Sequence, residues 1–285
     1  FPRISLGALG RGTNIWSHGD FTFADPLPFV LEPFNVPVEL INETPQSWTF
    51  IRGIKPWLAS LKAWKDLQIG PPPDQVYFWA LPFQLMQTYF AAPLPDASNQ
   101  VRRIADIVLA KSPSNDLAGF RRMGQANGFE WSGAPYLSPY LQSIDTSNGP
   151  CAFGGMFPAP GPNPIAADKL PSALNSTNLV CYDWELTGAR IEQWTFMSQF
   201  IRWVGMKAQL PDKAPSLECI RNIATHIGPT VTEIRRTAPN QLSFERHSTI
   251  GFTGIELNLL ADWLESPRFP VGLYGLLTPA PKPPE

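Results

Sequence analysis

The chain has 285 residues, of which 44% are hydrophobic and only 16% are charged, against roughly 25% charged residues in average soluble proteins. Its formal net charge is −2 and no cluster of Lys and Arg stands out, so the composition argues against a nucleic-acid partner. The low charge and the ten tryptophans indicate that other protein covers part of the surface.

Familiar catalytic and metal-binding motifs are missing from the sequence. There is no Gly-x-Ser-x-Gly elbow of a serine hydrolase and no glycine-rich loop for a phosphate. The three histidines and three cysteines lie too far apart for a zinc motif, although a Cys151–Cys181 disulfide stays open. We therefore expect no metal and no cofactor, and the sequence leans against an enzyme.

Residues 1–44 hold many Gly and Pro and show no helical periodicity. They also carry apolar side chains such as Phe21, Phe29 and Phe34, which water would not favour. We expect an extended N-terminal arm, with at most short strands, that lies on a neighbouring surface.

The next segment predicts a helix, two strands and a second helix. Pro56 suits the first turn of a helix, and Trp57, Leu61 and Trp64 recur on one face. No charged residue occurs from Gln75 to Pro95, a length near that of a membrane helix, but its prolines and aromatic residues favour two buried strands. We place these strands at 75–81 and 86–92 and the second helix at 99–111.

A proline-rich stretch at 158–164 is the best internal boundary. The elements expected on either side share the order of helix, turn and strand, which suggests two related halves. We expect an α+β fold of antiparallel or mixed sheets with packed helices, divided into an arm (1–44), a first half (45–163), a second half (164–272) and a proline-rich tail (273–285). Further expected strands are 119–131, 136–144, 152–157 and 178–186, with helices near 164–174, 189–204 and 216–227, a hairpin at 230–250 and a last helix begun by Thr253 and Glu256 as a capping box.

Two helices are expected to be apolar on more than one side. Helix 189–204 carries Phe196, Phe200 and Trp203 apart from its main stripe, and the last helix carries Trp263. A helix that is apolar on two sides has to be covered twice. We therefore predict that these four residues form an interface with partner chains.

Two acids on the expected strand 178–186 are the best candidates for chemistry. Asp183 and Glu185 alternate along the strand and so share one face, with Arg190 just beyond. The favoured interpretation is an Asp/Glu–Arg network that joins the strand end to the next helix. The alternative is a ligand pocket lined by the aromatic residues Trp79, Tyr89, Trp131 and Trp184.

The stretches Asn178–Trp194 and Ala261–Pro270 resemble an uncharacterised family of exported bacterial α+β proteins, over about residues 50–272. The resemblance implies an α+β fold and an extracytoplasmic location, periplasmic or at the cell surface. The family has no established activity, so the resemblance assigns no catalytic residue.

Together these features predict a structural or interaction subunit. We expect it to dock to other protein subunits through its apolar helices and proline-rich ends, and association with a membrane complex is a further expectation. The alternative function is a binding module or hydrolase for an apolar or carbohydrate-like ligand, with its pocket near Asp183 and Glu185.

Overall fold

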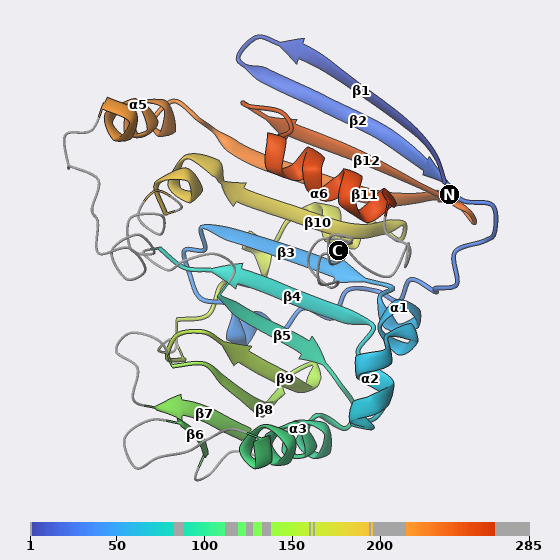
Figure 1. Cartoon of the computed structure of the whole chain (residues 1–285), viewed down its shortest axis with the longest axis vertical. Coiled ribbons are helices and arrows are strands. Elements are labelled where there is room, and N and C mark those ends of the chain that lie inside the picture. Colours follow the sequence, from blue (N-terminus) through green and yellow to red (C-terminus); the bar gives the residue numbers. More distant parts are fainter. Residues whose placement is uncertain are drawn as a thin grey trace, which may run out of the picture.

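A computed structural model describes residues 2–82, 88–111, 119–123, 128–132, 138–159, 161, 163–193, 195 and 215–265. In this part of the chain twelve strands form one open sheet in the order β1-β2-β12-β11-β10-β3-β4-β5-β9-β8-β7-β6 (Figure 1). Every neighbouring pair is antiparallel. The expected α+β class is confirmed in its broad form, with the sheet dominating.

The strands are β1 (Arg3–Arg11), β2 (Asn14–Thr22), β3 (Ser47–Arg52), β4 (Gln75–Ala80), β5 (Tyr89–Pro93), β6 (Gly119–Arg122), β7 (Gly128–Ser132), β8 (Tyr140–Thr146), β9 (Gly149–Gly155), β10 (Leu179–Leu186), β11 (Pro229–Ala238) and β12 (Gln241–Ser248). The helices are α1 (Lys55–Ser60), α2 (Lys62–Leu67), α3 (Ala97–Lys111), α5 (Pro215–Ala224) and α6 (Gly254–Glu265). Residues 187–193 are also helical.

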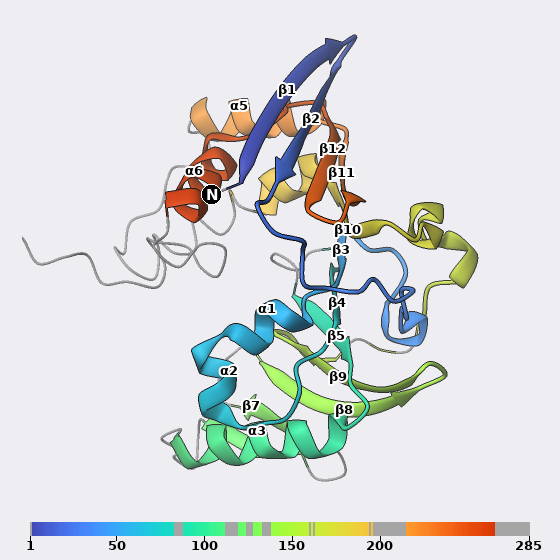
Figure 2. The same cartoon turned by 90° about the vertical axis from the view of Figure 1, so that its right-hand side faces the viewer.

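The two faces of the sheet are covered by different kinds of structure. Seen edge-on, α1, α2, α3 and α6 lie on one side, which we call the helical face (Figure 2). The other side is covered by irregular segments with short 3-10 turns at Val38–Leu40, Ala167–Lys169 and Ser172–Asn175. Because its side chains are largely aromatic, we call it the aromatic face.

The main core lies on the aromatic face. Cross-strand pairing places Trp184, Trp48, Trp79 and Tyr89 side by side on β10, β3, β4 and β5. Trp79 is fully enclosed and stacks between Tyr89 and Phe153, with ring centroids 5.9 Å away on each side. Such pairs combine a large apolar area with favourable ring geometry, so they fix the centre of the sheet.

Arg52 fastens an irregular segment to this core. Its guanidinium is buried and donates to the carbonyl oxygens of Glu32, Leu179 and Ser176, at 2.6, 2.6 and 2.8 Å. It also lies over the ring of Phe34, 4.4 Å from the centroid. A buried charge is tolerated when it is hydrogen-bonded in this way.

The expected N-terminal arm splits into two parts. Residues 3–22 form the hairpin β1–β2, which joins the sheet through β12. Further along, the Asn35 N–H donates to Gln75 Oε1 and Tyr77 Oη, both at 2.9 Å. This segment therefore packs on the chain's own aromatic face.

Several expected elements are confirmed, but the single helix expected from Pro56 is two short helices that break at Leu61, and another expected helix does not form. The strands β4 and β5, the helix α3 and the hairpin β11–β12 lie close to their expected positions. The helix expected near 164–174 is instead two 3-10 turns, because Pro164 and Pro171 bracket a segment too short for a stable helix. The last helix starts as expected, since the Thr253 N–H donates to Glu256 Oε2 at 2.7 Å.

Candidate functional site

The two predicted acids lie at the centre of the sheet, on β10. Side chains alternate between the faces of a strand, so Asp183 and Glu185 share the helical face while Trp184, between them, points to the aromatic face. The sequence correctly places the two acids on one side. The same alternation separates them from Trp184.

Asp183 belongs to a line of polar side chains that crosses five strands. The register aligns Ser17, Arg246, Thr232, Asp183 and Thr49 on β2, β12, β11, β10 and β3. We call this set the polar row. It runs along the helical face, where a core sheet would ordinarily carry apolar residues.

The charged members of this region are engaged with specific partners. The Thr49 hydroxyl donates to Asp183 Oδ1 at 2.5 Å. Arg190 Nε donates to Glu185 Oε2 at 3.1 Å, and both side chains are largely buried. Burial raises the pKa of Asp183, and the hydrogen bond from Thr49 opposes that rise only in part.

A second polar chain lies beside the polar row. The hydroxyls of Thr187 and Thr230 are 2.6 Å apart, and Thr230 in turn donates to Ser248 Oγ at 3.1 Å. Within the described residues, the buried atoms Ser47 Oγ and Thr232 Oγ1 have no hydrogen-bond partner. Of the expected Asp/Glu–Arg network, the structure has the ion pair of Glu185 with Arg190, while Asp183 is hydrogen-bonded to Thr49.

Three of the four predicted aromatic lining residues, Trp79, Tyr89 and Trp184, lie together in the core of the aromatic face, on the side of the sheet away from the two acids. Trp131 lies on β7 near the far end of the sheet, where it meets Phe120 edge-on at 4.8 Å. The structure therefore does not gather these side chains around the two acids.

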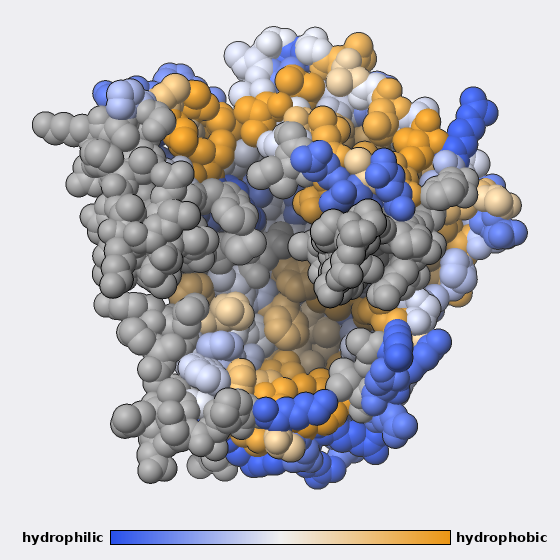
Figure 3. All heavy atoms as spheres, viewed as in Figure 1, coloured by the Kyte–Doolittle hydropathy of each residue, from blue (hydrophilic) through white to orange (hydrophobic). Residues whose placement is uncertain are grey.

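Of the four predicted interface residues, only Trp263 lies in the described part of the chain. It is half-buried on α6 and contacts Phe21 of β2, with ring centroids 6.2 Å apart. Phe196, Phe200 and Trp203 lie outside the described residues, as does the proline-rich tail 273–285. Figure 3 shows apolar residues spread over the helical face, with a hollow near its middle.

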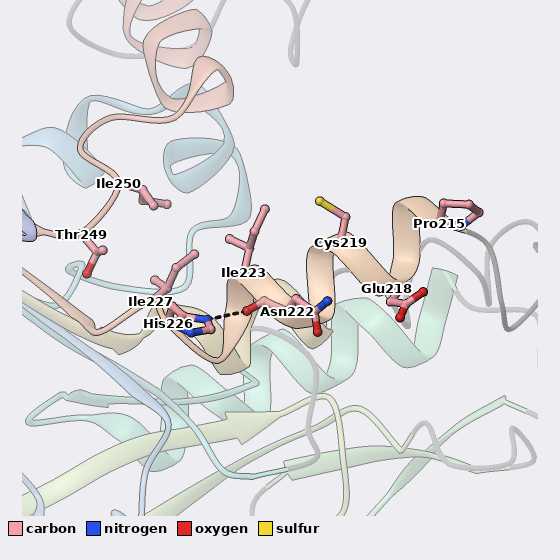
Figure 4. Close-up of a pocket in the computed structure, with 9 residues that line it drawn as sticks. All are labelled: Pro215, Glu218, Cys219, Asn222, Ile223, His226, Ile227, Thr249 and Ile250. Atoms are coloured by element: carbon pink, nitrogen blue, oxygen red, sulfur yellow. Dashed lines mark hydrogen bonds between the residues drawn. The ribbon is translucent and has the colours of Figure 1, made fainter.

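A shallow cavity of about 680 Å³ lies beside α5 (Figure 4). Cys219 and Ile223 point to one side of the helix, towards Ile250. His226 lies two turns from Cys219, and its Nδ1 is held 2.8 Å from the Asn222 carbonyl oxygen. Cys219 and His226 therefore do not form a nucleophile–base pair, and Cys219 is one of three free cysteines in the described part of the chain.

The edge strand β1 is the feature that sequence reasoning missed. It has nine residues, pairs with β2 on one side, and pairs with no described strand on the other. Leu6 and Leu9 are 53% and 50% exposed. Long apolar edges are rare in natural proteins because they invite another strand to pair.

The hairpin turn defines which groups of β1 face outward. Arg11 and Asn14 close a two-residue turn whose Gly12 has a φ of 61°. The closing pair exchanges both hydrogen bonds, so the odd-numbered residues of β1 bond to β2. The N–H and C=O groups of Ile4, Leu6, Ala8 and Gly10 then point away from the sheet, and we call this set the open edge.

The fold and the open edge define a class: an antiparallel sheet protein with one edge available for pairing. No family model, curated protein or solved structure matches the chain. The family resemblance and the exported location therefore stay predictions from the sequence. In the described residues, no helix is long and apolar enough to cross a membrane, and no three His, Cys, Asp or Glu side chains cluster as metal ligands.

Proposed function

We propose that the protein is an interaction subunit that binds a partner chain by strand addition at the open edge. One observation carries this proposal: β1 offers nine residues of edge backbone between exposed apolar side chains. In strand addition, main-chain hydrogen bonds provide affinity and alternate side chains provide specificity. The hairpin is well placed for this role because β2 is fixed to β12 along eight residues.

The proposal keeps the predicted function and changes the docking surface. The sequence assigns docking to apolar helices and proline-rich ends, whereas Trp263 is half-buried against Phe21 and the hairpin supplies an accessible strand. An extracytoplasmic location and association with a membrane complex remain predictions.

The test is to isolate the protein from its own cells as wild type, as Ala8→Pro and as Val30→Ala, and to weigh each by native mass spectrometry. Proline removes an outward N–H and leaves the bonds to β2 intact, as is tolerated on edge strands. Val30 is 72% exposed and lies outside β1, so Val30→Ala is the control. We expect a companion chain with the wild type and with Val30→Ala, and none with Ala8→Pro. Circular dichroism checks that the variants fold, and Leu6→Lys replaces Ala8→Pro if proline unfolds the hairpin.

A wild-type protein that runs as a bare monomer, or a companion that survives both Ala8→Pro and Leu6→Lys, would contradict strand addition at this edge. The rival function, a ligand-binding module or hydrolase at Asp183 and Glu185, has no supporting observation of comparable weight. Both acids there already hold partners within the chain.

We also propose that the chain consists of two related halves. The order of strand, helical segment, two strands and helix occurs as β3 to α3 and again as β10 to α6. The first strands of the two sets pair antiparallel at the centre, with Trp48 opposite Trp184, and α3 and α6 lie on the same face (Figure 2). Superposing the two sets in an experimental structure tests this, and a mismatch in strand order or helix side would contradict it.

A further inference from the structure

The open edge can accept a strand of about nine residues. Four outward residues, each with one N–H and one C=O, provide about eight hydrogen bonds to a neighbouring strand. Every residue from Arg3 to Arg11 pairs in register with β2, without a bulge. The backbone is therefore regular enough to pair along its whole length.

The charges on β1 are of one sign and lie at its two ends. Arg3 and Arg11 are exposed, and the seven residues between them are uncharged. The Arg11 guanidinium lies over the Trp16 ring, 4.4 Å from its centroid, which holds this charge near the hairpin turn. A neighbouring strand thus meets positive charge at each end.

A second copy of the chain is a poor occupant of this edge. Antiparallel pairing that uses all four outward residues places Arg3 of one copy opposite Arg11 of the other, at both ends. Like charges directly opposite each other destabilise a sheet. Shifting the register to place Leu6 opposite Leu6, or Ala8 opposite Ala8, separates the arginines but pairs only three outward residues of each copy. Gly10 then faces Pro2, which has no N–H, or Ile4 faces Gly12 in the hairpin turn.

The side chains of β1 set the pattern that a neighbour has to match. Ile4, Leu6 and Ala8 lie on the helical face, opposite Phe21, Gly19 and Ser17. On the aromatic face, Gly7 leaves room for the ring of His18: a Cβ there would lie 2.7 Å from Nε2. A complementary strand thus carries apolar residues opposite Ile4, Leu6 and Ala8, with small or polar residues between them.

We infer that the partner contributes an extended segment of about nine residues with acidic residues at both ends, opposite Arg3 and Arg11, and apolar residues at alternate positions between them. This inference rests on the proposed function and specifies the partner's chemistry. Because the positive charges lie at both ends, the same pattern fits a parallel or an antiparallel neighbour.

The test compares two fluorescently labelled peptides by anisotropy: Glu-Val-Thr-Val-Thr-Val-Thr-Val-Glu and the same peptide with Lys at both ends. We expect the wild-type protein to bind the Glu-ended peptide about tenfold more tightly, since two attractive cross-strand pairs replace two repulsive ones. Arg3→Glu with Arg11→Glu should reverse the preference. Arg102→Glu with Arg121→Glu makes the same change in net charge elsewhere and should leave the preference unchanged.

The outcomes separate the inference from the function on which it rests. If both peptides bind equally and Ala8→Pro abolishes both, strand addition stands and the acidic pattern is wrong. If neither peptide binds, the inference is overturned, and the native isolation experiment decides the function independently. Sedimentation showing a wild-type dimer that Ala8→Pro abolishes would also overturn the inference, because the occupant would then be a second copy.

Discussion

The two edges of the sheet are built in opposite ways. At one end β6 has only four residues, two of which, Arg121 and Arg122, are exposed arginines. The helix α3 packs against it, and Arg122 Nη2 lies 2.5 Å from Asp106 Oδ1 on that helix. At the other end β1 has nine residues, an uncharged centre and apolar side chains that are about half exposed.

Short length, charge and a covering helix are the usual means by which proteins stop edge strands from pairing with other chains. β6 has all three, whereas β1 is long, carries charge only at its two ends, and is covered by no helix among the described residues. The contrast teaches that the same sheet protects one edge and presents the other. The proposed partner rests on this difference and not on apolar surface in general.

The largest expected effect comes from breaking the attachment of the β1 edge to the sheet. Gly19 lies on β2, between β1 and β12. A Cβ at Gly19 would lie 2.3 Å from the Ser5 carbonyl oxygen and 2.7 Å from the Phe244 ring, so Gly19→Ala pushes both neighbouring strands away from β2. We expect the free energy of unfolding to fall by about 1–3 kcal/mol, as for overpacked sites, in urea denaturation.

Gly10→Ala is the matched control for that variant. A Cβ at Gly10 meets nothing within 4 Å, so the substitution should leave the stability nearly unchanged. Equal losses for the two variants would show that β1 is not packed on β2 as described.

A smaller effect is expected at α6, which supports the same edge from the helical face. Glu256 accepts hydrogen bonds from the N–H and the hydroxyl of Thr253, and it forms an ion pair with Arg246 at 2.6 Å. Burial opposes these contacts, but they outweigh it and hold the pKa of Glu256 below its ordinary value. Glu256→Gln should therefore lower the free energy of unfolding at pH 7 by about 1 kcal/mol, the usual scale of a lost cap.

The pH dependence of that variant gives a sharper check. The folded-state pKa of Glu256 is below the unfolded one, so its contribution is complete above the unfolded pKa and is lost as the pH falls through the folded pKa. The stability difference between wild type and Glu256→Gln should close at acidic pH. A difference that stays constant down to about pH 3 would exclude the charge as its cause.

The smallest effect is expected at the protected edge. The side chains of Arg122 and Asp106 are 50% and 59% exposed, and exposed ion pairs contribute little because solvent screens them. Arg122→Ala should change the free energy of unfolding by no more than about 0.5 kcal/mol in urea denaturation. A loss above about 1 kcal/mol would mean that the ion pair between Arg122 and Asp106 fixes β6 to α3, and that Arg122 does more than place a charge at the edge of the sheet.

The sequence predicts local features of this fold well. Alternation and turn residues locate β4, β5 and the β11–β12 hairpin, and the spacing of Thr253 and Glu256 identifies the start of α6. The shared face of Asp183 and Glu185 also follows from the two-residue period of a strand. The same period already separates Trp184 from the two acids.

The order of the strands in the sheet could not be predicted from the sequence. Trp131 is separated from Asp183 by the five strands between β7 and β10 in the sheet order, and no local pattern encodes that order. The hairpin β1–β2 was missed for another reason. Its many glycines suggest an irregular arm, although Gly12 at the first turn position and the alternation of Ile4, Leu6 and Ala8 are typical of a hairpin.

Site-resolved amide hydrogen exchange on β1 tests the central claim most directly. In the isolated chain we predict alternation: slow exchange at Ser5, Gly7 and Leu9, whose N–H groups bond to β2, and fast exchange at the N–H groups of the open edge. Uniform protection along the strand would mean that something within the chain already covers the edge. Uniform fast exchange would mean that the hairpin does not form, and either result would contradict the account.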